Sequence, residues 1–526
     1  MARPLKVVRI PFHFALLLAG LVGFIALVYE IVWARVYSFA TASRAVAFGF
    51  MLGSYLLGLA IGSLVSRHWQ KRGTQQSVAL QSVARLMVTA NVVAFLVVPL
   101  VSWTVVVTHW VFTLPLVTVG ATLLGTLLPL LCHAAIPPDE NVGVRMSYVY
   151  IANIAGSGLG SLLTGFYLFE YCNLQQIAQG SLLLALVLCL VVSHFFERTP
   201  ADYATWALTG GLILSAPILY QELFERLQYR ADYWINRPFV TVLENRHGVI
   251  TVDDEKKVHG GGIYDGMMDT RPTHGGGLIR PYFISALHAA PREILVIGMS
   301  GGAWTQILAH HPQADQVTVV EINSGYLRLL ASYPEVSSLL TNPKVEIVID
   351  DGRRWLRRNP GRHFDVIVMN TSYHWREFAS NLLGKEFLQL GRRHLKPGGL
   401  MMWNTTGSSR AAATGLAVFP HTMMVSNNCV GSDAPLLIDQ ARWRSILSTY
   451  RIDDRPVFDL SSETGRKELE QMLWVANPDN PSGSLMFRPA LETNYGTAKL
   501  ITDDNLGEEY GFVLRDNLFL KKIFRR

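Results

Sequence analysis

The sequence predicts an N-terminal α-helical transmembrane bundle followed by a soluble α/β domain. Composition is the first reason: the chain has 526 residues, of which only 16 % are charged, whereas soluble proteins carry about 25 %. The charge is also uneven, because 17 charged side chains lie in residues 1–220 and 69 in residues 221–526. The second reason is an alternation of strand and helix patterns toward the C-terminus. We therefore expect a membrane domain at 1–222, a linker with a small β-meander at 223–290, and an α/β domain at 291–526.

Seven apolar stretches in the first part are long enough to cross a bilayer, which takes about 20 residues. They cover residues 12–33, 45–66, 84–102, 107–133, 147–168, 176–196 and 204–221. The first stretch is too long for a signal peptide and lacks a small-residue cleavage site. The sequence therefore predicts an integral protein of the inner or plasma membrane.

Small residues recur at helix-packing intervals in the second and fifth of these spans. They are Gly53, Gly58, Gly62, Gly156 and Gly160. Such positions let helix backbones approach closely, which predicts a compact bundle, with a lipid or substrate groove as the alternative. We expect Asn153 to form an interhelical hydrogen bond. Glu30 and Arg35 flank Trp33 at the end of the first span, where they are either functional or interfacial.

The basic residues bear on the orientation of the bundle. If the N-terminus is cytoplasmic, nine Lys and Arg fall on that side and five on the other, which fits the positive-inside rule. With seven spans the α/β domain then lies outside, away from nucleotide-like cofactors. Either the span count is off by one, or the charge bias misleads, or the domain is extracytoplasmic. Because its motifs are those of a nucleoside-binding domain, we expect the α/β domain in the cytoplasm.

Composition also excludes some partners. The four cysteines are scattered and have no metal-ligand spacing, so no metal is expected. Lys and Arg number 11 against 6 acidic residues in the first 220 residues, and 35 against 34 in the rest, so the soluble part carries no basic surface for nucleic acid. The expected partners are the lipid bilayer and a small-molecule or lipid-like acceptor. The oligomeric state, a homo-oligomer included, is left open.

Short strands predict a small β-meander between the two domains. We expect these strands at Phe239–Leu243, Gly248–Val252 and Gly262–Tyr264. Two glycine triplets follow His259 and His274. Such triplets either let the backbone approach a ligand or form tight turns.

The α/β domain begins with a nucleoside-binding pattern. A continuous apolar strand, Glu293–Gly298, runs into a glycine-rich turn, Gly298–Gly302, and then into a helix. The next strand, Val317–Glu321, ends in an acid about 20 residues beyond the turn. The glycines permit backbone approach to the ligand, and the carboxylate accepts hydrogen bonds from ribose hydroxyls.

Three further strands complete the pattern. They are Val345–Ile349, followed by Asp350 and Asp351, then Phe364–Asn370, and finally the end of His394–Trp403. Their order and spacing predict a Rossmann-like domain of the S-adenosylmethionine-binding, methyltransferase-like type.

With these motifs the chain resembles the membrane-fused spermidine synthase-like (polyamine aminopropyltransferase-like) proteins. In the membrane part the resemblance rests on Ala26–Trp33, Leu57–Ser63 and Asn153–Gly160. In the soluble part it rests on the Rossmann motifs and on Ile501–Tyr510. The family transfers an aminopropyl group from decarboxylated S-adenosylmethionine to an amine.

The resemblance implies a set of cofactor-binding residues. It implies that the glycine turn borders the nucleoside, that Glu321 holds the ribose and that Asp351 faces the adenine, with Asp350 better suited to capping the strand end. The candidates are thus Gly298, Gly301, Gly302, Glu321, Asp350 and Asp351.

Departures from the family pattern affect the chemistry. Gly301 stands where the family has an aspartate in the glycine turn, and Asn370 and Tyr373 stand at its two aspartates after the fourth strand. The Tyr-and-acid motif is also missing at Gly277–Tyr282. Carboxylates bind the polycationic amine and assist its deprotonation. The pattern therefore predicts nucleoside binding more strongly than spermidine synthesis.

Other side chains are candidates for the missing groups. His374 has the intrinsic pKa of a general base, with Tyr373 and Arg376 as orienting or anion-binding groups. The alternative is a polar loop that caps a domain contact. Asp265 and Asp269, between the glycine triplets, are the remaining carboxylates expected near the ligand. An acidic patch at Asp503, Asp504, Glu508 and Glu509 is read as a solvated face or a turn cap.

Three functions stay open on this basis. The first is a membrane-embedded transferase that uses S-adenosylmethionine or its decarboxylated form on an amine or membrane-associated acceptor. The second is a non-catalytic nucleoside-binding sensor or transport-coupled module. The third is a methyltransferase-like or sulfonium-cleaving enzyme.

Overall fold

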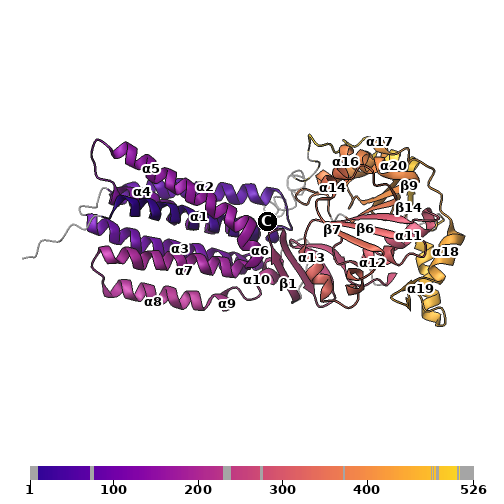
Figure 1. Ribbon diagram of the computed structural model, residues 1–526, viewed down its shortest axis with the longest axis horizontal. Helices are drawn as coiled ribbons and strands as arrows, with labels where there is room; N and C mark the ends of the chain where they lie inside the picture. Colours follow the sequence, from indigo (N-terminus) through magenta and orange to yellow (C-terminus); the bar gives the residue numbers. More distant parts are fainter. Residues whose placement is uncertain are drawn as a thin grey trace, which may run out of the picture. The chain divides into compact units, whose positions relative to one another are not determined.

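The computed structural model (Figure 1) describes residues 10–70, 76–228, 238–272, 277–370, 373–475, 477, 479–480, 485–505, 507 and 509. Its contacts divide the chain into two units. The helical unit comprises residues 1–43, 47–238 and 244–249, and the α/β unit comprises residues 44–46, 239–243 and 250–526.

The helical unit is built from long apolar helices. They are α1 (Phe12–Ala40), α2 (Val46–Gln70), α3 (Gln76–Val107), α4 (Leu114–Ala135), α5 (Val142–Leu163), α7 (Leu174–Val192) and α8 (Pro200–Leu214). Short helical segments α6 (Phe169–Tyr171), α9 (Ala216–Leu219) and α10 (Leu223–Gln228) complete the unit in the described part of the chain.

Six of these segments are long and apolar enough to cross a membrane. The seventh predicted span, 204–221, falls on α8 and its successors, where Pro200–Leu214 and Ala216–Gln228 meet at 57°. Pro217 lies in the first turn of α9, and proline cannot supply the amide that would continue the preceding helix. The described residues thus hold six candidate spans, or seven if the bent pair counts as one.

Glycines bring two pairs of helices into close contact. A Cβ at Gly156 of α5 would lie 1.8 Å from the carbonyl oxygen of Gly20 in α1, and one at Gly62 of α2 would lie 2.1 Å from that of Thr122 in α4. The predicted interhelical bond of Asn153 is confirmed, because its Nδ2 donates to the Ala19 carbonyl at 3.0 Å. The packing role predicted for Gly53 is wrong, since no described atom lies within 4 Å of a Cβ there.

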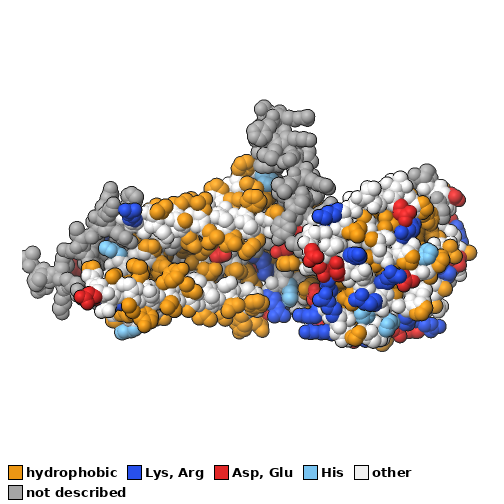
Figure 2. All heavy atoms as spheres, turned by 90° about the horizontal axis from the view of Figure 1, so that it is seen from above, with side chains coloured by type: hydrophobic (Ala, Val, Ile, Leu, Met, Phe, Trp, Pro, Cys, Tyr) orange, Lys and Arg blue, Asp and Glu red, His pale blue; other side chains and the backbone are white. Residues whose placement is uncertain are grey.

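The outward side chains of the helical unit are apolar. Leu57 and Leu64 of α2 are 56 % and 67 % exposed, and Ile151 of α5 is 60 % exposed. Figure 2 shows hydrophobic side chains over the helical unit, whereas charged ones gather on the α/β unit. An apolar surface of this extent is typical of a membrane or protein interaction surface.

The α/β unit begins with a four-stranded sheet in the order β1–β2–β3–β4. Its strands are β1 (Phe239–Asn245), β2 (Gly248–Asp253), β3 (Lys257–Gly260) and β4 (Ile263–Met267). The sequence pattern missed β3, which places Gly260 in a strand and leaves Gly261 and Gly262 for the turn, at φ +61° and +78°. The described residues do not include His274 or the first two glycines of the second triplet, Gly275 and Gly276.

The main sheet has eight strands, in the order β14–β10–β11–β9–β8–β5–β6–β7. They are β5 (Glu293–Ile297), β6 (Gln316–Glu321), β7 (Val345–Ile349), β8 (Phe364–Met369), β9 (Leu395–Asn404), β10 (His421–Val425), β11 (Asn428–Ser432) and β14 (Leu485–Phe487). The five predicted strands, β5 to β9, are confirmed and pair in parallel. The sequence pattern missed the antiparallel strands β11, β10 and β14 at one edge.

Helices cover both faces of this sheet (Figure 1). One face packs on α11 (Ile279–Leu287), α12 (Ala303–Ala309), α13 (Gly325–Ala331) and α18 (Gln440–Ser448). The other packs on α14 (Gly352–Arg358), α16 (Lys385–Arg393), α17 (Ser409–Val418) and α20 (Arg488–Tyr495). Ile294 and Val296 of β5 enter the first core, and Leu295 and Ile297 the second. A strand buried on both faces must be apolar throughout, which explains the continuous run in the sequence.

Smaller elements finish the α/β unit. They are α15 (Ser380–Leu383), α19 (Glu463–Val475) and the paired short strands β12 (Arg451–Ile452) and β13 (Arg455–Pro456). Because β5 to β8 are parallel, the residues after each strand gather at one edge of the sheet, where α/β proteins bind their ligands.

Candidate functional site

The loop after β5 is a tight turn held in left-handed backbone conformations. Gly298, Ser300 and Gly302 have φ values of +84°, +52° and +82°. Glycine adopts this region without a steric penalty, whereas Ser300 is an exception that the surrounding contacts must stabilise. A Cβ at Gly298 would also lie 3.2 Å from the Asn370 carbonyl oxygen. The loop therefore needs a residue without a side chain at this point.

Glu321, the last residue of β6, holds this loop in place. Its Oε2 accepts the N–H of Met299 at 2.7 Å, and its Oε1 accepts the N–H of Asn323 at 2.8 Å. The side chain is buried, and burial raises the pKa of the Glu321 carboxyl, while backbone N–H bonds from Asn323, Met299 and Ser300 oppose the rise. A carboxylate has about four lone-pair sites, so a ligand hydroxyl can still donate to it.

Asp265 of β4 is brought to the same loop from the smaller sheet. Ser300 Oγ donates to the Asp265 carbonyl at 2.6 Å, and Tyr326 Oη donates to its carboxylate at 2.5 Å. Arg376 Nη1 lies 3.4 Å from the other carboxylate oxygen, and the Asp265 side chain is 9 % exposed. Burial raises the pKa of Tyr326 well above its usual value, so this hydroxyl stays a donor.

Gly260 makes room for this cluster of Asp265, Tyr326 and Arg376. A Cβ at Gly260 would lie 2.7 Å from Tyr326 Oη and 3.0 Å from Asp265 Oδ2. The sequence pattern missed Tyr326, because an aromatic residue in a short amphipathic helix has the same appearance as an ordinary core residue. The first glycine triplet was the available signal for Gly260.

The other candidate carboxylates have local partners. Asp269 forms an ion pair with Arg271, Oδ2 to Nη2 at 2.6 Å. Asp350 pairs with Arg354, and its Oδ1 accepts the Asp351 N–H at 2.7 Å. Asp351 caps α14 by accepting the N–H of Arg354 at 2.7 Å. The structure does not bring Asp269 into the Asp265 cluster, and adenine contact by Asp351 stays a prediction.

The loop after β8 carries the predicted general base. Asn370 continues the pairing of β8 with β5, because its N–H donates to the Ile297 carbonyl at 3.1 Å. Thr371 and Ser372 lie outside the described residues. The rings of Tyr373 and His374 pack on Trp375, with centroids 4.3 Å and 5.0 Å away.

This loop is anchored at both ends in the site. Asn370 lies beside the turn after β5, and Arg376 reaches the carboxylate of Asp265. Tyr373 and His374 therefore lie between the turn after β5 and the Asp265 cluster along the chain. Of this loop, Arg376 is the residue that contacts the Asp265 carboxylate.

Two acidic residues near the C-terminus bind other segments of the α/β unit. Asp503 pairs with Arg353, Oδ1 to Nη1 at 2.7 Å, and Glu509 accepts the N–H of Ser380 at 2.7 Å at the start of α15. Glu509 thus caps the start of α15, and Glu508 lies outside the described residues. Among the described residues, no group of three His, Cys, Asp or Glu side chains could hold a metal ion.

Gly301 cannot take the aspartate that the family pattern has at this position. A Cβ at Gly301 would lie 2.8 Å from Val258 Cγ2 and 3.2 Å from the Met267 carbonyl oxygen. We expect Gly301→Asp to destabilise the α/β unit by about 1–3 kcal/mol, the usual cost of overpacking. Thermal unfolding measures the loss, and Gly361→Asp, at a glycine with open space around it, is the control. Equal midpoints for the two variants would contradict the prediction.

Comparisons with known proteins identify the domain. Residues 283–409 match the model of the spermine/spermidine synthase domain. The polyamine aminopropyltransferase of Oceanobacillus iheyensis is 21 % identical over 399 residues, covering 74 % of this chain and 76 % of that protein. The polyamine aminopropyltransferase of Mycobacterium tuberculosis H37Rv is 24 % identical over 455 residues, covering 78 % and 83 %. A match of this length extends beyond the α/β unit.

Solved structures show weaker overall similarity. The spermidine synthase from Thermotoga maritima covers 45 % of this chain and 89 % of its own, with 19 % identity and a TM-score of 0.34. A spermidine synthase in complex with the transition state analogue AdoDATO covers the same shares, with 18 % identity and a TM-score of 0.35. The predicted resemblance is confirmed: residues 283–409 match the spermine/spermidine synthase domain, and the chain is similar to transferases named polyamine aminopropyltransferases.

Proposed function

We propose that this protein is a membrane-embedded transferase of the aminopropyltransferase type. It binds S-adenosylmethionine or decarboxylated S-adenosylmethionine at the carboxyl ends of β5, β6 and β7, and it transfers an aminopropyl or related group to an amine or a membrane-associated acceptor. The observation that carries the proposal is Glu321, a buried carboxylate that holds the glycine turn through the Met299 N–H and keeps lone pairs for ribose hydroxyls.

The chemistry needs a neutral acceptor next to the sulfonium. The lone pair of the acceptor amine attacks the carbon bound to sulfur, the carbon–sulfur bond breaks toward sulfur, and methylthioadenosine leaves. The acceptor loses one proton to a base, for which His374 is our candidate. Tyr326 and Arg376 hold Asp265 at the side of the site.

The acceptor is expected to differ from a free diamine. Asn370 and Tyr373 supply no negative charge, and the carboxylate of Asp265 already faces the guanidinium of Arg376. A dication that leaves water to bind here would therefore find no unpaired carboxylate among these residues to offset the loss of its hydration.

We expect little or no spermidine when the purified full-length protein is incubated with decarboxylated S-adenosylmethionine and putrescine. The double variant N370D/Y373D restores two carboxylates, and we expect it to form more spermidine than the wild type. Product analysis by chromatography measures both. Abundant spermidine from the wild type would show that the missing carboxylates are not needed.

His374→Ala is expected to lower turnover by about 10²–10⁴-fold, the usual contribution of general acid–base catalysis, and to leave donor binding unchanged. His363→Ala is the matched control, because His363 precedes β8 at the amino end of the strand, whereas His374 follows its carboxyl end. An unchanged rate in His374→Ala would remove His374 as the base.

Titration calorimetry of the full-length protein with S-adenosylmethionine, its decarboxylated form and methylthioadenosine tests the nucleoside site itself. We expect at least one of the three to bind. Absence of binding by all three would overturn the transferase proposal together with any methyltransferase-like or sulfonium-cleaving reaction.

A second candidate function is a nucleoside-binding module without catalysis. Asn370 and Tyr373 favour it, because they occupy the places where an aminopropyltransferase has its catalytic carboxylates. This candidate predicts binding in the calorimeter and no methylthioadenosine release with any acceptor supplied.

A further inference from the structure

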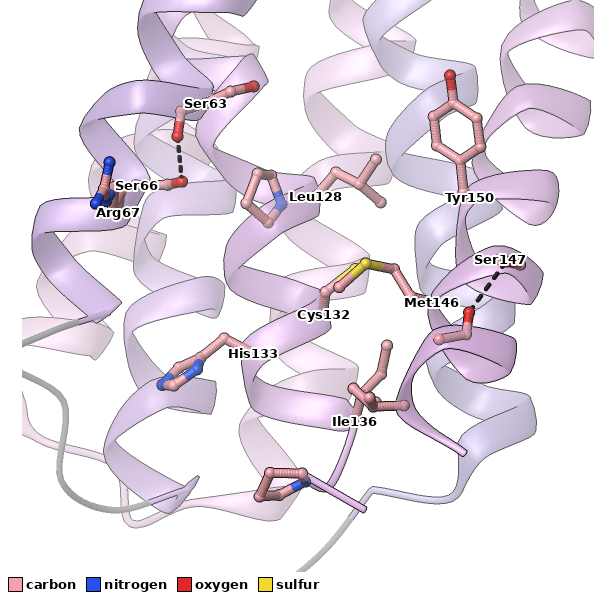
Figure 3. Close-up of a pocket in the computed structure, with 14 residues that line it drawn as sticks. Ser63, Ser66, Arg67, Leu128, Cys132, His133, Ile136, Met146, Ser147 and Tyr150 are labelled. Carbon is pink, nitrogen blue, oxygen red and sulfur yellow. Dashed lines mark hydrogen bonds between the residues drawn. The ribbon is translucent and has the colours of Figure 1, made fainter. Parts of the chain in front are cut away.

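A cavity of about 750 Å³ lies within the helical unit, between α2, α4 and α5 (Figure 3). Its lining includes Arg67, Cys132, His133, Ile136, Met146 and Tyr150. Figure 3 shows Cys132 and Met146 facing each other across its middle, with Arg67 and His133 to one side and Tyr150 to the other. None of these residues belongs to the α/β unit, so the cavity is separate from the nucleoside site.

The cavity lies where three candidate spans end. The second span ends at Arg67, the fourth ends at Ala135, and the fifth begins at Val142. In a membrane protein this level is the boundary between hydrocarbon and headgroups. A ligand in the cavity can therefore have an apolar part in the bilayer and a polar part at its surface.

The walls of the cavity are apolar and open to the outside. Leu128, Pro129 and Ile136 form one wall, and Met146, 50 % exposed, and Tyr150, 58 % exposed, belong to the other. The second and fifth spans are the least buried of the six, with only 22 % of the residues in each span's most apolar stretch buried. Acyl chains of the bilayer can therefore reach the cavity from the side.

The charge at the cavity is positive. Arg67 is a charged lining residue, His133 lies beside it, and the lining residues that the structure describes include no carboxylate. The nearby Arg145 is already paired with Asp139, Nη1 to Oδ2 at 2.7 Å, and does not line the cavity. A guanidinium binds phosphate through two parallel hydrogen bonds. The complementary ligand is an amphiphile with an anionic phosphate headgroup.

We propose that this cavity binds an anionic phospholipid, with the phosphate at Arg67 and His133 and an acyl chain along Ile136 and Met146. Lipid binding at this place joins α2, α4 and α5 at one end of the bundle. The proposal is independent of the reaction proposed for the α/β unit.

Native mass spectrometry of the full-length protein with equal amounts of phosphatidylglycerol and phosphatidylcholine tests the proposal. We expect the wild type to retain phosphatidylglycerol preferentially. In Arg67→Gln the preference is expected to fall about fivefold, the effect of one basic residue near an anionic membrane surface. Arg145→Gln, which removes a paired guanidinium at the same end of the bundle, is expected to keep it.

A second measurement reports on occupancy of the cavity. In a Cys172→Ala background, we expect Cys132 to react with an apolar maleimide in phosphatidylcholine and to react more slowly in phosphatidylglycerol. Thermal unfolding checks that the variants are folded.

Three results would overturn the proposal. They are equal retention of the two lipids by the wild type, an equal loss in Arg145→Gln and Arg67→Gln, and a Cys132 that does not react in either lipid, which would mean that the chain itself fills the cavity. Displacement of the lipid by millimolar inorganic phosphate would likewise reject a lipid-specific site in favour of a free-anion site.

Discussion

Glu321→Gln is expected to weaken nucleoside binding by about 10- to 150-fold. A hydrogen bond to a charged group contributes roughly 1.5–3 kcal/mol, and the substitution removes the charge that the ribose hydroxyls would meet. It also turns an amide nitrogen toward one of the two N–H donors, Met299 and Asn323, that the carboxylate now satisfies. Both effects disturb the glycine turn and its ligand together.

The measurement is titration calorimetry with whichever of the three nucleosides binds the wild type. Asp365→Asn is the matched control, because Asp365 also accepts a backbone N–H, that of Glu293 at 2.8 Å, but near the amino end of β8. Thermal unfolding separates lost binding from lost folding. Equal affinities for Glu321→Gln and the wild type would remove Glu321 from the nucleoside site.

Glu321 also predicts how nucleoside binding depends on pH. Burial raises the pKa of Glu321 above its usual value, and the ionised form is the better acceptor for ribose hydroxyls. The affinity for the nucleoside is therefore expected to be highest when the pH is above the raised pKa of Glu321, and to fall as the pH drops through that pKa. The fall begins at a higher pH than an exposed glutamate would produce, and it is absent in Glu321→Gln. An affinity that is constant through the acidic range would contradict this assignment.

Gly156→Leu is expected to produce the largest loss of stability in the helical unit. A Cβ at this position would lie 1.8 Å from the Gly20 carbonyl oxygen, 2.5 Å from its carbonyl carbon and 2.8 Å from its Cα. These atoms are backbone, so α1 and α5 must separate to accept any side chain. Separation also breaks the contact at Gly160, where a Cβ would lie 2.4 Å from the Phe24 carbonyl oxygen.

Gly158→Leu is the matched control, since Gly158 lies two residues further along α5 with no described atom within 4 Å of a Cβ. We expect this variant to purify as the wild type does, and Gly156→Leu to give little folded protein or a much lower thermal midpoint in detergent. Equal midpoints would show that the α1–α5 contact is not closely packed in the folded protein.

Periodicity and composition predicted the elements that depend on local sequence. The apolar runs became helices α1 to α8, and the continuous run Glu293–Ile297 became the central strand β5. The strand prediction succeeds because burial on both faces demands apolar residues at every position. The helix predictions succeed because the outward side chains of the helical unit are apolar as well. The glycines at 58, 62, 156 and 160 were also recognised, although Gly53 shows that spacing does not reveal which side of a helix meets a neighbour.

Residues that depend on long-range contacts were not predictable in the same way. Tyr326 lies 61 positions from Asp265, its hydrogen-bond partner, and no periodic pattern links them. The strand β3 was missed because the glycines that end it resemble a loop. The antiparallel strands β10, β11 and β14 were missed for a similar reason, since antiparallel pairing depends on the neighbour across the sheet.

Taken by itself, the sequence predicted a helical part with an apolar surface and a Rossmann-like domain that resembles the spermine/spermidine synthases, because both predictions rest on local hydropathy and on motifs around single turns. Only the tertiary structure decided which carboxylates meet at the site. It joined Asp265 to Tyr326 and Arg376, left Asp269 with Arg271, and placed Asp351 at a helix cap. The physical reason is that a side chain's partners are set by which strands and loops the sheet brings to one edge, and this depends on the whole fold.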